Sequence, residues 1–387
     1  MKTVKRAYKF RFYPSSEQAE LLNRTFGCVR LVFNLALEAR TAAWKSNRRN
    51  LSYADTSAML TQWKHCSELA FLKEVSSVPL QQSLRHLHSG FKRFWKKQSA
   101  YPRFKSKRRS KASAEFTASA FRWDGEQLRL ARMPEPLQIV WSRSLPANAV
   151  PSTVTVSRDR ADRWFVSILV EEETLAKPPA AKNKAVGIDL GLESLAVLST
   201  GEKIDNPRYE RRDRTRLIRA QRRLARKQKG SANFAKARVK VARIYAAIAD
   251  RRRDHLHKLT TRLVRENQTV VIENLSIQQL KAKGGRRKTG LNRTMSDASW
   301  GALRSMLEYK SRWRDRHLIV IEPWFPSTQL CSQCGAITGP KSLDVRVWTC
   351  ACGTHHDRDV NAAKNLLAAG LAATVCGDGR RLVRGHA

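Results

Sequence analysis

The feature that most constrains this chain is its excess of positive charge. The 387 residues include 74 Lys and Arg against 33 Asp and Glu, which gives a formal net charge of +41 at pH 7. A compact fold with that excess repels itself unless a polyanion neutralises it. Hydrophobic residues still make up 42% of the chain, enough for a core, so the composition is not that of a disordered protein. We therefore expect a folded protein that binds nucleic acid, because small acidic substrates need no field of this size.

Membrane insertion and secretion are not expected. No apolar run approaches the roughly 18 residues that a membrane span requires. The basic start at Lys2 is followed by Tyr8-Lys9-Phe10-Arg11-Phe12, where a signal peptide needs an apolar stretch. We expect a cytoplasmic protein with no membrane partner and with cysteines that stay reduced.

The first half of the chain predicts a β domain interrupted by helices. Tyr8, Phe10 and Phe12 alternate with basic residues, which is typical of a half-buried strand over residues 1–13. Helical spacing of apolar residues then predicts a helical domain over 14–105. Strand patterns and turn residues follow over 106–180, and we expect this small β domain to be completed by the first strand. A Pro-rich stretch near its end, within 171–184, reads as a linker.

A basic block with aromatic residues spans 92–111. It holds ten Lys and Arg and no acid, interleaved with four aromatic residues. A solvated helix end running into a loop is the simpler reading, but such a block is more typical of contact with phosphates and bases. We expect Lys96, Lys97 and Arg103 to bind nucleic acid.

The second half, residues 181–387, predicts an α/β domain with a long basic insertion. Ala185–Leu190 reads as a strand and Leu195–Ser199 as its hairpin partner, while 203–265 holds 22 Lys and Arg against five acids. Residues 281–293 read as a basic loop, and the tail over about 374–387 is expected to be disordered. The basic insertion carries arginines at helical spacing, which would share one helix face as nucleic-acid contacts: Arg212, Arg216, Arg219, Arg223 and Arg226.

Three acids occupy places where catalytic carboxylates are found. Asp189 and Glu273 each end an apolar strand, and Asp359 stands at the start of a helix with an Ala-rich side. Singly they could be a turn residue, a salt-bridged strand end and a helix cap. Together in one half-dry pocket they would repel one another unless Mg²⁺ or Mn²⁺ lay among them, because hard cations prefer oxygen ligands. Two such ions can hydrolyse a phosphodiester, so the trio favours metal-dependent nuclease chemistry.

Four cysteines have the spacing of a structural zinc site. Cys331 and Cys334 form a C-x₂-C pair, and Cys350 and Cys352 form a second pair with one residue between them. The shorter second pair leaves His355 or His356 open as a substitute ligand. Disulfides are the alternative, and they are not expected inside a cell.

These motifs together resemble the TnpB family, transposon-encoded RNA-guided DNA endonucleases related to type V CRISPR effectors. The resemblance rests on GIDLG (187–191), VVIENL (270–275), SDASWG (296–301) and the cysteine pairs followed by DRDVNAAKN (357–365), in that order. The opening segment 8–34 is similar to that family as well, so the resemblance covers nearly the whole chain.

The resemblance implies a fold and a set of partners. It implies a RuvC-like, RNase H-type nuclease domain over 181–387 with a zinc ribbon inserted at about 326–356. It also implies a helical recognition domain over 14–105 and a β-barrel-like wedge domain from 1–13 and 106–180. Asp189, Glu273 and Asp359 match the family's catalytic acids. A monomeric, nucleoid-associated prokaryotic protein would bind a guide RNA from the transposon end and target DNA beside a short adjacent motif. The helical insertion around Tyr53 and residues 77–81, which include Gln81, would help to read that motif.

Other functions remain open at this point. GIDLG could be a phosphate loop of an actin-like ATPase, but no second Asp-x-Gly loop follows a convincing strand. A guide-dependent DNA-binding protein without cleavage, acting as a repressor or transposition accessory, would not need all three acids. A zinc protein that binds DNA without a guide is the third alternative, and RNA that co-purifies with the protein would argue against it.

Overall fold

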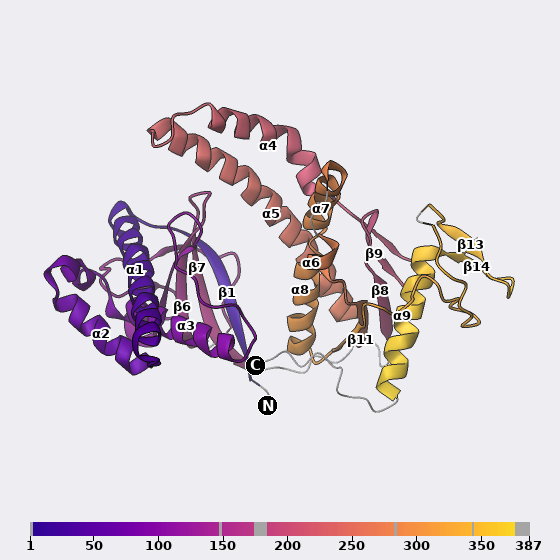
Figure 1. Cartoon of the computed structure of the whole chain (residues 1–387), viewed down its shortest axis with the longest axis horizontal. Helices are drawn as coiled ribbons and strands as arrows, with labels where there is room; N and C mark the ends of the chain where they lie inside the picture. Colours follow the sequence, from indigo (N-terminus) through magenta and orange to yellow (C-terminus); the bar gives the residue numbers. More distant parts are fainter. Residues whose placement is uncertain (1–2, 147–148, 174–183, 282–284, 343, 376–387) are drawn as a thin grey trace. The chain divides into compact units, whose positions relative to one another are not determined.

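The structure, a computed structural model, describes residues 3–146, 149–173, 184–281, 285–342 and 344–375 (Figure 1). The chain divides into two compact units, Met1–Glu173 and Thr174–Ala387, which we describe separately. Most of the expected linker, residues 174–183, and nearly all of the expected disordered tail, residues 376–387, lie outside the described residues. No helix of the described part is both long and apolar enough to cross a membrane.

The N-terminal unit is a five-stranded sheet with three helices inserted after its first strand. The sheet is antiparallel, with the order β2-β6-β7-β1-β5. Within the described residues β2 and β5 are edge strands, so the barrel-like closure implied by the resemblance is not seen there. The elements are β1 (Thr3–Tyr13), α1 (Ser16–Asn47), α2 (Tyr53–His65), the 3₁₀ helix η1 (Ser67–Lys73), α3 (Ser77–Trp95), β2 (Ala112–Thr117), β3 (Phe121–Trp123), β4 (Leu128–Leu130), β5 (Gln138–Val140), β6 (Pro151–Arg158) and β7 (Trp164–Glu173).

Helices and sheet of this unit share one hydrophobic core. Phe10 and Phe12 of β1 are almost fully buried, and they belong to the same cluster as Leu22 of α1 and Leu84 of α3. Ser15 caps α1 through a capping box with Gln18. The segments that the sequence divided into a helical and a β domain are therefore packed as one body.

The C-terminal unit is built on a second five-stranded sheet with the order β10-β9-β8-β11-β12. Strand β8 is antiparallel to β9 and parallel to β11, which is parallel to β12. The predicted hairpin after residue 190 is thus present as β8 and β9. The strands are β8 (Ala185–Asp189), β9 (Ser194–Leu198), β10 (Lys203–Asp205), β11 (Thr269–Glu273) and β12 (His317–Ile321).

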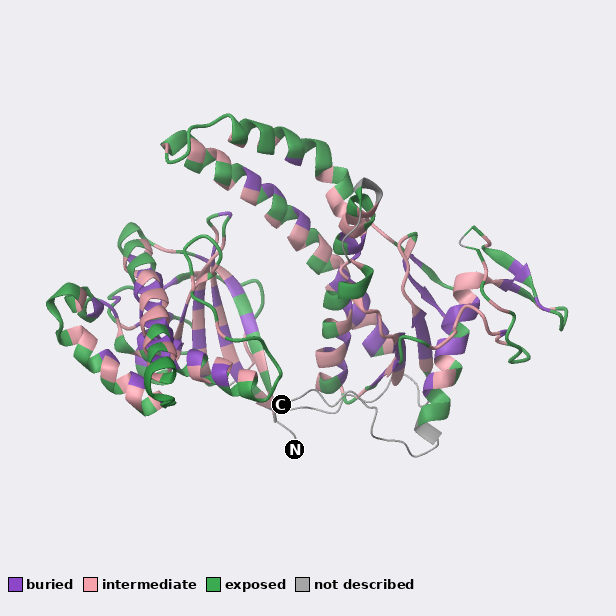
Figure 2. Ribbon diagram, viewed as in Figure 1, coloured by how far each residue is buried: buried purple, intermediate pink, exposed green. Residues whose placement is uncertain are grey.

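Helices cover both faces of this sheet. Ile188 and Ile272 face one side and belong to a core with residues of α5 (Ala232–Glu266) and α8 (Trp300–Trp313). Val271 faces the other side, where α9 (Arg358–Val375) packs through Leu366. Figure 2 shows the strands and the inner sides of these helices as buried. The strands read as continuous apolar runs because both faces are covered.

A helical hairpin extends from this core. Helix α4 (Tyr209–Ala225) and the outer half of α5 form a hairpin with a small core of Leu217, Val241, Ile244 and Ile248. Figure 1 shows this hairpin projecting from the rest of the unit.

Residues 281–293 were predicted to be a loop, and for most of their length that was wrong. The short helix α6 (Ile277–Leu280) is followed by α7 (Arg286–Ala298), which begins within that stretch.

A small ribbon lies between β12 and α9. Its strands β13 (Val347–Thr349) and β14 (His355–Asp357) pair antiparallel. Strand β14 ends at Asp357 and α9 begins at the next residue, so the ribbon leads directly into the helix that carries Asp359.

Candidate active site and zinc centre

The strand register places Asp189 beside Glu273. Ile188 of β8 lies opposite Ile272 of β11 in a parallel pair, and the two acids are the next residues along. Side chains of neighbouring parallel strands in register point to the same face, about 4.8 Å apart. Both carboxylates therefore stand at the carboxyl ends of adjacent strands, on the face that α9 covers.

Helix α9 brings Asp359 to the same edge because glycines let it approach closely. A Cβ on Gly187 of β8 would lie 2.1 Å from the carbonyl oxygen of Ala363. A Cβ on Gly370 of α9 would lie 2.6 Å from a methyl group of Val271. Only glycine fits at either position without a shift, so the backbone of α9 rests on β8 and β11. Asp359 lies in the first turn of this helix.

Asp359 is not the cap of its helix. Asp357 takes that role, since its Oδ1 accepts hydrogen bonds from the backbone N–H groups of Asp359 (3.1 Å) and Val360 (3.0 Å). The other oxygen of Asp357 accepts a 2.6 Å bond from Lys203. The Asp359 carboxylate is therefore left for other interactions.

The electrostatics of the acids are those of crowded carboxylates. Burial raises the pKa of Asp189 well above its usual range, and the neighbouring charges of Glu273 and Asp359 raise it further. Burial also raises the pKa of Glu273 to about 7, although the backbone N–H of Leu190, which donates to Oε1 at 2.9 Å, opposes this. The positive charge of Arg358 opposes the rise at Asp189 but is the smallest of these effects, so repulsion among the acids remains, and a divalent cation would relieve it.

Arg346 of the ribbon reaches this group of acids. Its guanidinium lies 3.6 Å from Oδ2 of Asp359 and 2.9 Å from Oε2 of Glu193. Among the residues that the structure describes, the three acids are not gathered as tightly as the cysteine cluster described next. The oxygen-only donor set suits Mg²⁺ or Mn²⁺, and Arg346 supplies positive charge to the third acid.

The four predicted cysteines converge. The ligand sulfurs of Cys331, Cys334, Cys350 and Cys352 all lie within 4.8 Å of one another. The Cys331–Cys352 and Cys334–Cys350 sulfur pairs are 3.8 and 3.7 Å apart. A tetrahedral zinc with Zn–S bonds of about 2.3 Å implies sulfurs about 3.8 Å apart. The arrangement therefore fits zinc, and none of the four is in a disulfide.

His356 lies beside the cysteine cluster. Its Nε2 is 3.0 Å from the sulfur of Cys331, and its ring centre lies 4.6 Å from that of Trp348, with the two rings tilted by 36°. It does not belong to the group of four converging sulfurs. His355 is exposed and contacts the hydroxyl of Thr349 instead. The placement of His356 suits a hydrogen bond to a ligand sulfur rather than replacement of Cys352.

Two buried asparagines of α9 hold the turn that carries Cys331 and Cys334, which we call the cysteine knuckle. The sequence analysis assigned these asparagines no role. Asn361 accepts from the N–H of Ser332 (2.9 Å) and donates to the carbonyl of Leu330 (2.7 Å), while Asn365 donates to the same carbonyl (2.8 Å). Their signal in the sequence is their i, i+4 spacing on an otherwise apolar helix face. Arg346 was missed as well, because an ion pair across thirteen residues leaves no local pattern.

The predicted arginine stripe lies on α4 as expected from its spacing. All five arginines are exposed: Arg212, Arg216, Arg219, Arg223 and Arg226. Arg226 follows the last helical residue as its C-cap. Leu217 faces α5 on the opposite side. The stripe is therefore available to a polyanion.

The candidate nucleic-acid residues of the N-terminal unit are spread over two places. Tyr53 begins α2, with the guanidinium of Arg85 4.7 Å from its ring centre, and Gln81 is exposed on α3. Lys96, Lys97 and Arg103 are exposed beyond the end of α3. Near these three, Trp95 and Tyr101 expose 48% and 42% of their surface, so the basic block does present aromatic rings to solvent.

Comparison with known proteins gives a consistent picture. Residues 165–283 match the IS605 OrfB family, described as "Probable transposase", and 300–366 match the Cas12f1-like TNB domain. Residues 1–49 match the helix-turn-helix domain of the IS605 OrfB family, although the structure has β1 and one long helix there.

Whole-chain relatives agree with these matches. A Streptomyces pristinaespiralis protein named "Putative RNA-guided DNA endonuclease" is 62% identical, and the alignment covers 98% of this chain and 93% of that protein. InsQ of Escherichia coli K12, given the same description, is 33% identical over 96% of this chain and 94% of its own length. A cryo-EM structure of a Cas12f1–sgRNA–target DNA complex shares the fold, with a TM-score of 0.58 at 12% identity, over 94% of this chain and 98% of that one.

Proposed function

The chain belongs to the TnpB-type IS605 OrfB family, and on that premise we propose that it is an RNA-guided DNA endonuclease. A guide RNA from the transposon end pairs with target DNA next to a short adjacent motif, and a RuvC-like site in the C-terminal unit hydrolyses phosphodiesters. Relatives named as RNA-guided DNA endonucleases over nearly their whole length support this reading.

The observation that carries the nuclease activity is the meeting of Asp189, Glu273 and Asp359 at one edge of the sheet. These residues would hold Mg²⁺ or Mn²⁺. Such ions, if bound there, would supply activation of a water molecule and charge stabilisation at the leaving oxygen of a phosphodiester. The chain's own part is to fix the ligands: Leu190 orients Glu273 through its N–H, and the glycine contacts of α9 hold Asp359 against β8.

The distribution of charge supports a division of labour between protein and RNA. A protein of this size reads a long target sequence more readily through base pairing of a bound RNA than through its own side chains. The exposed arginines of α4 and the basic residues after α3 then grip guide RNA and heteroduplex by their phosphates. Tyr53 and Gln81 contribute to reading the adjacent motif.

We assign the remaining parts in the same scheme. Residues 1–13 and 106–180 form a wedge domain, 14–105 a recognition domain and 181–387 the nuclease domain, with zinc in the ribbon as a structural ion. The protein acts as a monomer at the nucleoid in the cytoplasm of a prokaryote and takes part in transposition.

The test begins with the nucleic acid that co-purifies with the protein. Sequencing it identifies the guide, and a target plasmid matching that guide is then incubated with protein and Mg²⁺. We expect cutting by wild type, and a loss of at least a thousandfold for Asp189→Ala with guide binding unchanged. Asp205→Ala, at an exposed position of β10, is the matched control and should cut normally.

Three outcomes would overturn parts of this proposal. Equal cutting by Asp189→Ala excludes the assigned site. Guide-dependent binding without cutting by wild type points to the repressor or accessory function. Absence of bound RNA, with equal binding to any duplex, points to a guide-independent DNA-binding protein.

A further inference from the structure

The hairpin of α4 and the outer half of α5, residues 209–248, is an arm that is joined to the sheet through α5. Ile248 is buried in the small core of the arm, and Leu256 is buried in the core of the sheet. None of the residues between them, 249–255, is buried, and we call this stretch the joint. Apolar packing therefore holds α5 on both sides of the joint but not within it. The direction of the arm depends there on the stiffness of the helix and on polar contacts.

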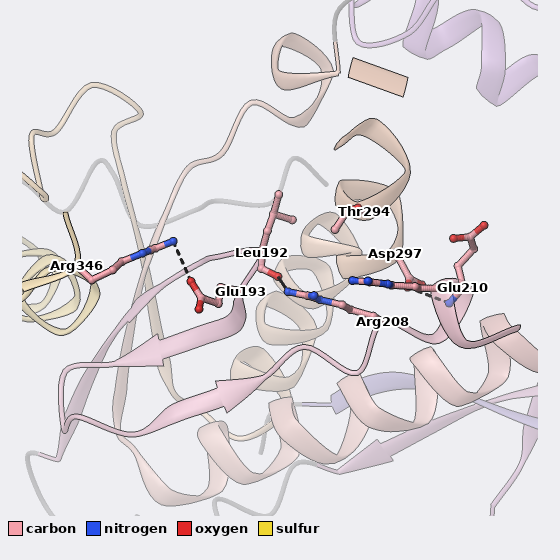
Figure 3. A pocket seen from close by; sticks show the side chains of 8 residues that line it. Leu192, Glu193, Arg208, Glu210, Thr294, Asp297 and Arg346 are labelled. Carbon is pink, nitrogen blue, oxygen red and sulfur yellow. Dashed lines mark hydrogen bonds and ion pairs between the residues drawn. The ribbon is translucent and has the colours of Figure 1, made fainter. Parts of the chain in front are cut away.

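One carboxylate, that of Asp297 near the end of α7, contacts both helices of the arm at its base. Its Oδ2 accepts the backbone N–H of Glu210, the second residue of α4, at 2.9 Å (Figure 3). Its Oδ1 accepts the Nε–H of Arg252 in the joint at 3.2 Å, and a second nitrogen of that guanidinium donates to the same oxygen. The side chains of Asp297 and Arg252 are only 6% and 24% exposed, so water screens this ion pair weakly. A single side chain thus ties α4 and α5 to α7.

The start of α4 has no cap of its own. Arg208, the residue before the helix, is in the left-handed conformation with φ 48°, and its side chain makes no capping hydrogen bond. It donates instead to the carbonyl of Leu192 at 3.3 Å, outside the helix. The first N–H groups of a helix lack partners within the helix, and a carboxylate near them also complements the helix dipole. Asp297 therefore serves as the cap of α4, although it lies 87 residues from Glu210 in the sequence.

The base of the arm is open on one side. A cavity of about 420 Å³ is lined in part by Arg208, Glu210 and Asp297, so the first turn of α4 borders open space there. With 17 residues, α4 is roughly 25 Å long. A tilt of about 10° at its base would move its far end, near Arg226, by about 4 Å. Such a displacement is larger than a hydrogen bond to a phosphate tolerates.

We propose that Asp297 is a positioning residue, which clamps the arm to α7 and so fixes the arginines of α4 relative to the acids of the sheet. The inference rests on the proposed nuclease function, because nucleic acid held by these arginines has to reach the acids in the correct place. Without the clamp the arginines still bind phosphates, but the bound strand is misplaced. A misplacement of about 1 Å can slow an enzyme about a hundredfold.

Hydrogen exchange of the full-length protein without nucleic acid tests the clamp independently of cutting. Asp297→Ala should speed exchange at least tenfold at the first amides of α4 and in the joint, while residues 214–222 and β11 keep their rates. Asp254→Ala is the matched control, since it removes one negative charge from the joint itself. Asp254 is exposed and pairs with Lys258 of the same helix, so its loss should leave exchange unchanged.

A second variant separates the two contacts of the carboxylate. Asp297→Ala leaves the charge of Arg252 without this partner, which could destabilise the unit as a whole. Asp297→Asn keeps an oxygen that accepts the N–H of Glu210 and loses only the negative charge. Exchange should then rise in the joint by at least threefold, while the Glu210 amide stays protected.

Single-turnover cutting by the guide-loaded protein tests the positioning role. Asp297→Ala should cut at least tenfold more slowly than wild type, because the bound strand is misplaced. Its affinity for the guide should stay within about threefold, because every arginine of α4 is still present. Asp254→Ala should cut at the wild-type rate.

The clamp and the nuclease can fail separately. Unchanged exchange in both Asp297 variants would overturn the clamp, whatever the cutting rates are. Faster exchange with normal cutting by Asp297→Ala would overturn its positioning role. A wild-type protein that never cuts would refute the proposed nuclease, and the exchange rates of Asp297→Ala would still decide whether the arm is clamped.

Discussion

The backbone N–H of Leu190 donates a 2.9 Å hydrogen bond to Oε1 of Glu273, joining the turn after β8 to the last residue of β11. The bond holds one oxygen of Glu273 in place next to Asp189. It also favours the charged form of a carboxylate whose pKa burial raises to about 7. Glu273 is thus positioned by the neighbouring strand but remains easy to protonate.

Protons should compete with divalent cations at Glu273. A protonated carboxyl is a poor ligand, so cutting at fixed Mg²⁺ should fall as the pH drops below about 7. Raising Mg²⁺ tenfold should move the midpoint of the pH profile down by up to about one unit. Rates measured across pH at two Mg²⁺ concentrations check this, and a midpoint that ignores Mg²⁺ contradicts it.

The same shift has a consequence for stability. Because folding raises the pKa of Glu273, its contribution to stability is fully present below pH 4.5, the ordinary pKa of a glutamate. This contribution is lost as the pH rises through about 7. Mg²⁺ should therefore raise the melting temperature more at pH 8 than at pH 6. Glu273→Gln should reduce that difference, and an equal effect of Mg²⁺ on both proteins would argue against cation binding here.

Gly187→Ala should separate α9 from the sheet. The added methyl group would meet the carbonyl oxygen of Ala363 at 2.1 Å and the backbone nitrogen of Leu367 at 2.9 Å, and neither can rotate away. Overpacking of this kind costs about 1–3 kcal/mol. We expect a lower melting temperature and at least tenfold slower cutting, because Asp359 moves with its helix, while guide binding persists.

A matched glycine distinguishes the packing effect from a general effect of alanine. Gly27 lies within α1, and a Cβ there would meet nothing within 4 Å. Gly27→Ala should be neutral or stabilising by up to about 1 kcal/mol. Normal cutting by Gly187→Ala would mean that α9 need not rest on β8.

Cys352 and His356 should differ in their effect on zinc. Thr354 donates to the sulfur of Cys352 and lowers its pKa to about 6, which favours the thiolate that zinc binds. Cys352→Ser should lose the metal. His356→Ala should keep one zinc per chain with about 10- to 100-fold weaker affinity. Metal analysis and chelator titration measure both, and full zinc content in Cys352→Ser would make His356 the fourth ligand.

Lys310 should make stability rise with pH. It is buried between α8 and α5, where its ammonium donates 2.7 Å bonds to the carbonyl of His257 and to the hydroxyls of Thr260 and Thr261. Burial, with a smaller effect of Arg314, lowers its pKa from 10.5 to about 8. The unfolded chain therefore holds more protons between pH 8 and 10.5, and stability increases over that range.

Lys310→Met removes this pH response and keeps much of the side-chain volume. The unfolding free energy of wild type should gain roughly 2 kcal/mol relative to the variant between pH 8 and 10. Chemical denaturation at several pH values measures the gain. If the plots of unfolding free energy against pH ran parallel for the two proteins, the three hydrogen bonds would be keeping Lys310 protonated despite its burial.

The positions of the three acids could be predicted from the sequence because each acid ends an apolar strand or lies at the start of a helix with an apolar side. Residues 186–188 and 270–272 are apolar because both faces of the sheet are covered, and the parallel register then brings Asp189 and Glu273, which follow them, side by side. The cysteine pairs were equally readable, since their ligand spacing is local.

Contacts between residues far apart in the sequence could not be predicted from such local patterns. The contacts of Arg346 with Glu193 and Asp359 join three separate segments, and no local periodicity encodes them. Residues 285–293 were misjudged because Gly284 and Gly285 suggested a turn. The helix begins directly after these glycines, and its last turns are fixed by burial of Met295 and Ala298 against the core.

The direct join between β14 and α9 leaves the chain no slack between the ribbon and the third acid. Asn361 and Asn365 fasten the same helix to the cysteine knuckle a second time. Zinc bound in the ribbon would then determine whether Asp359 is held in place for cleavage. In a cell depleted of zinc, the full-length protein would still bind its guide and its target but would not cleave the DNA.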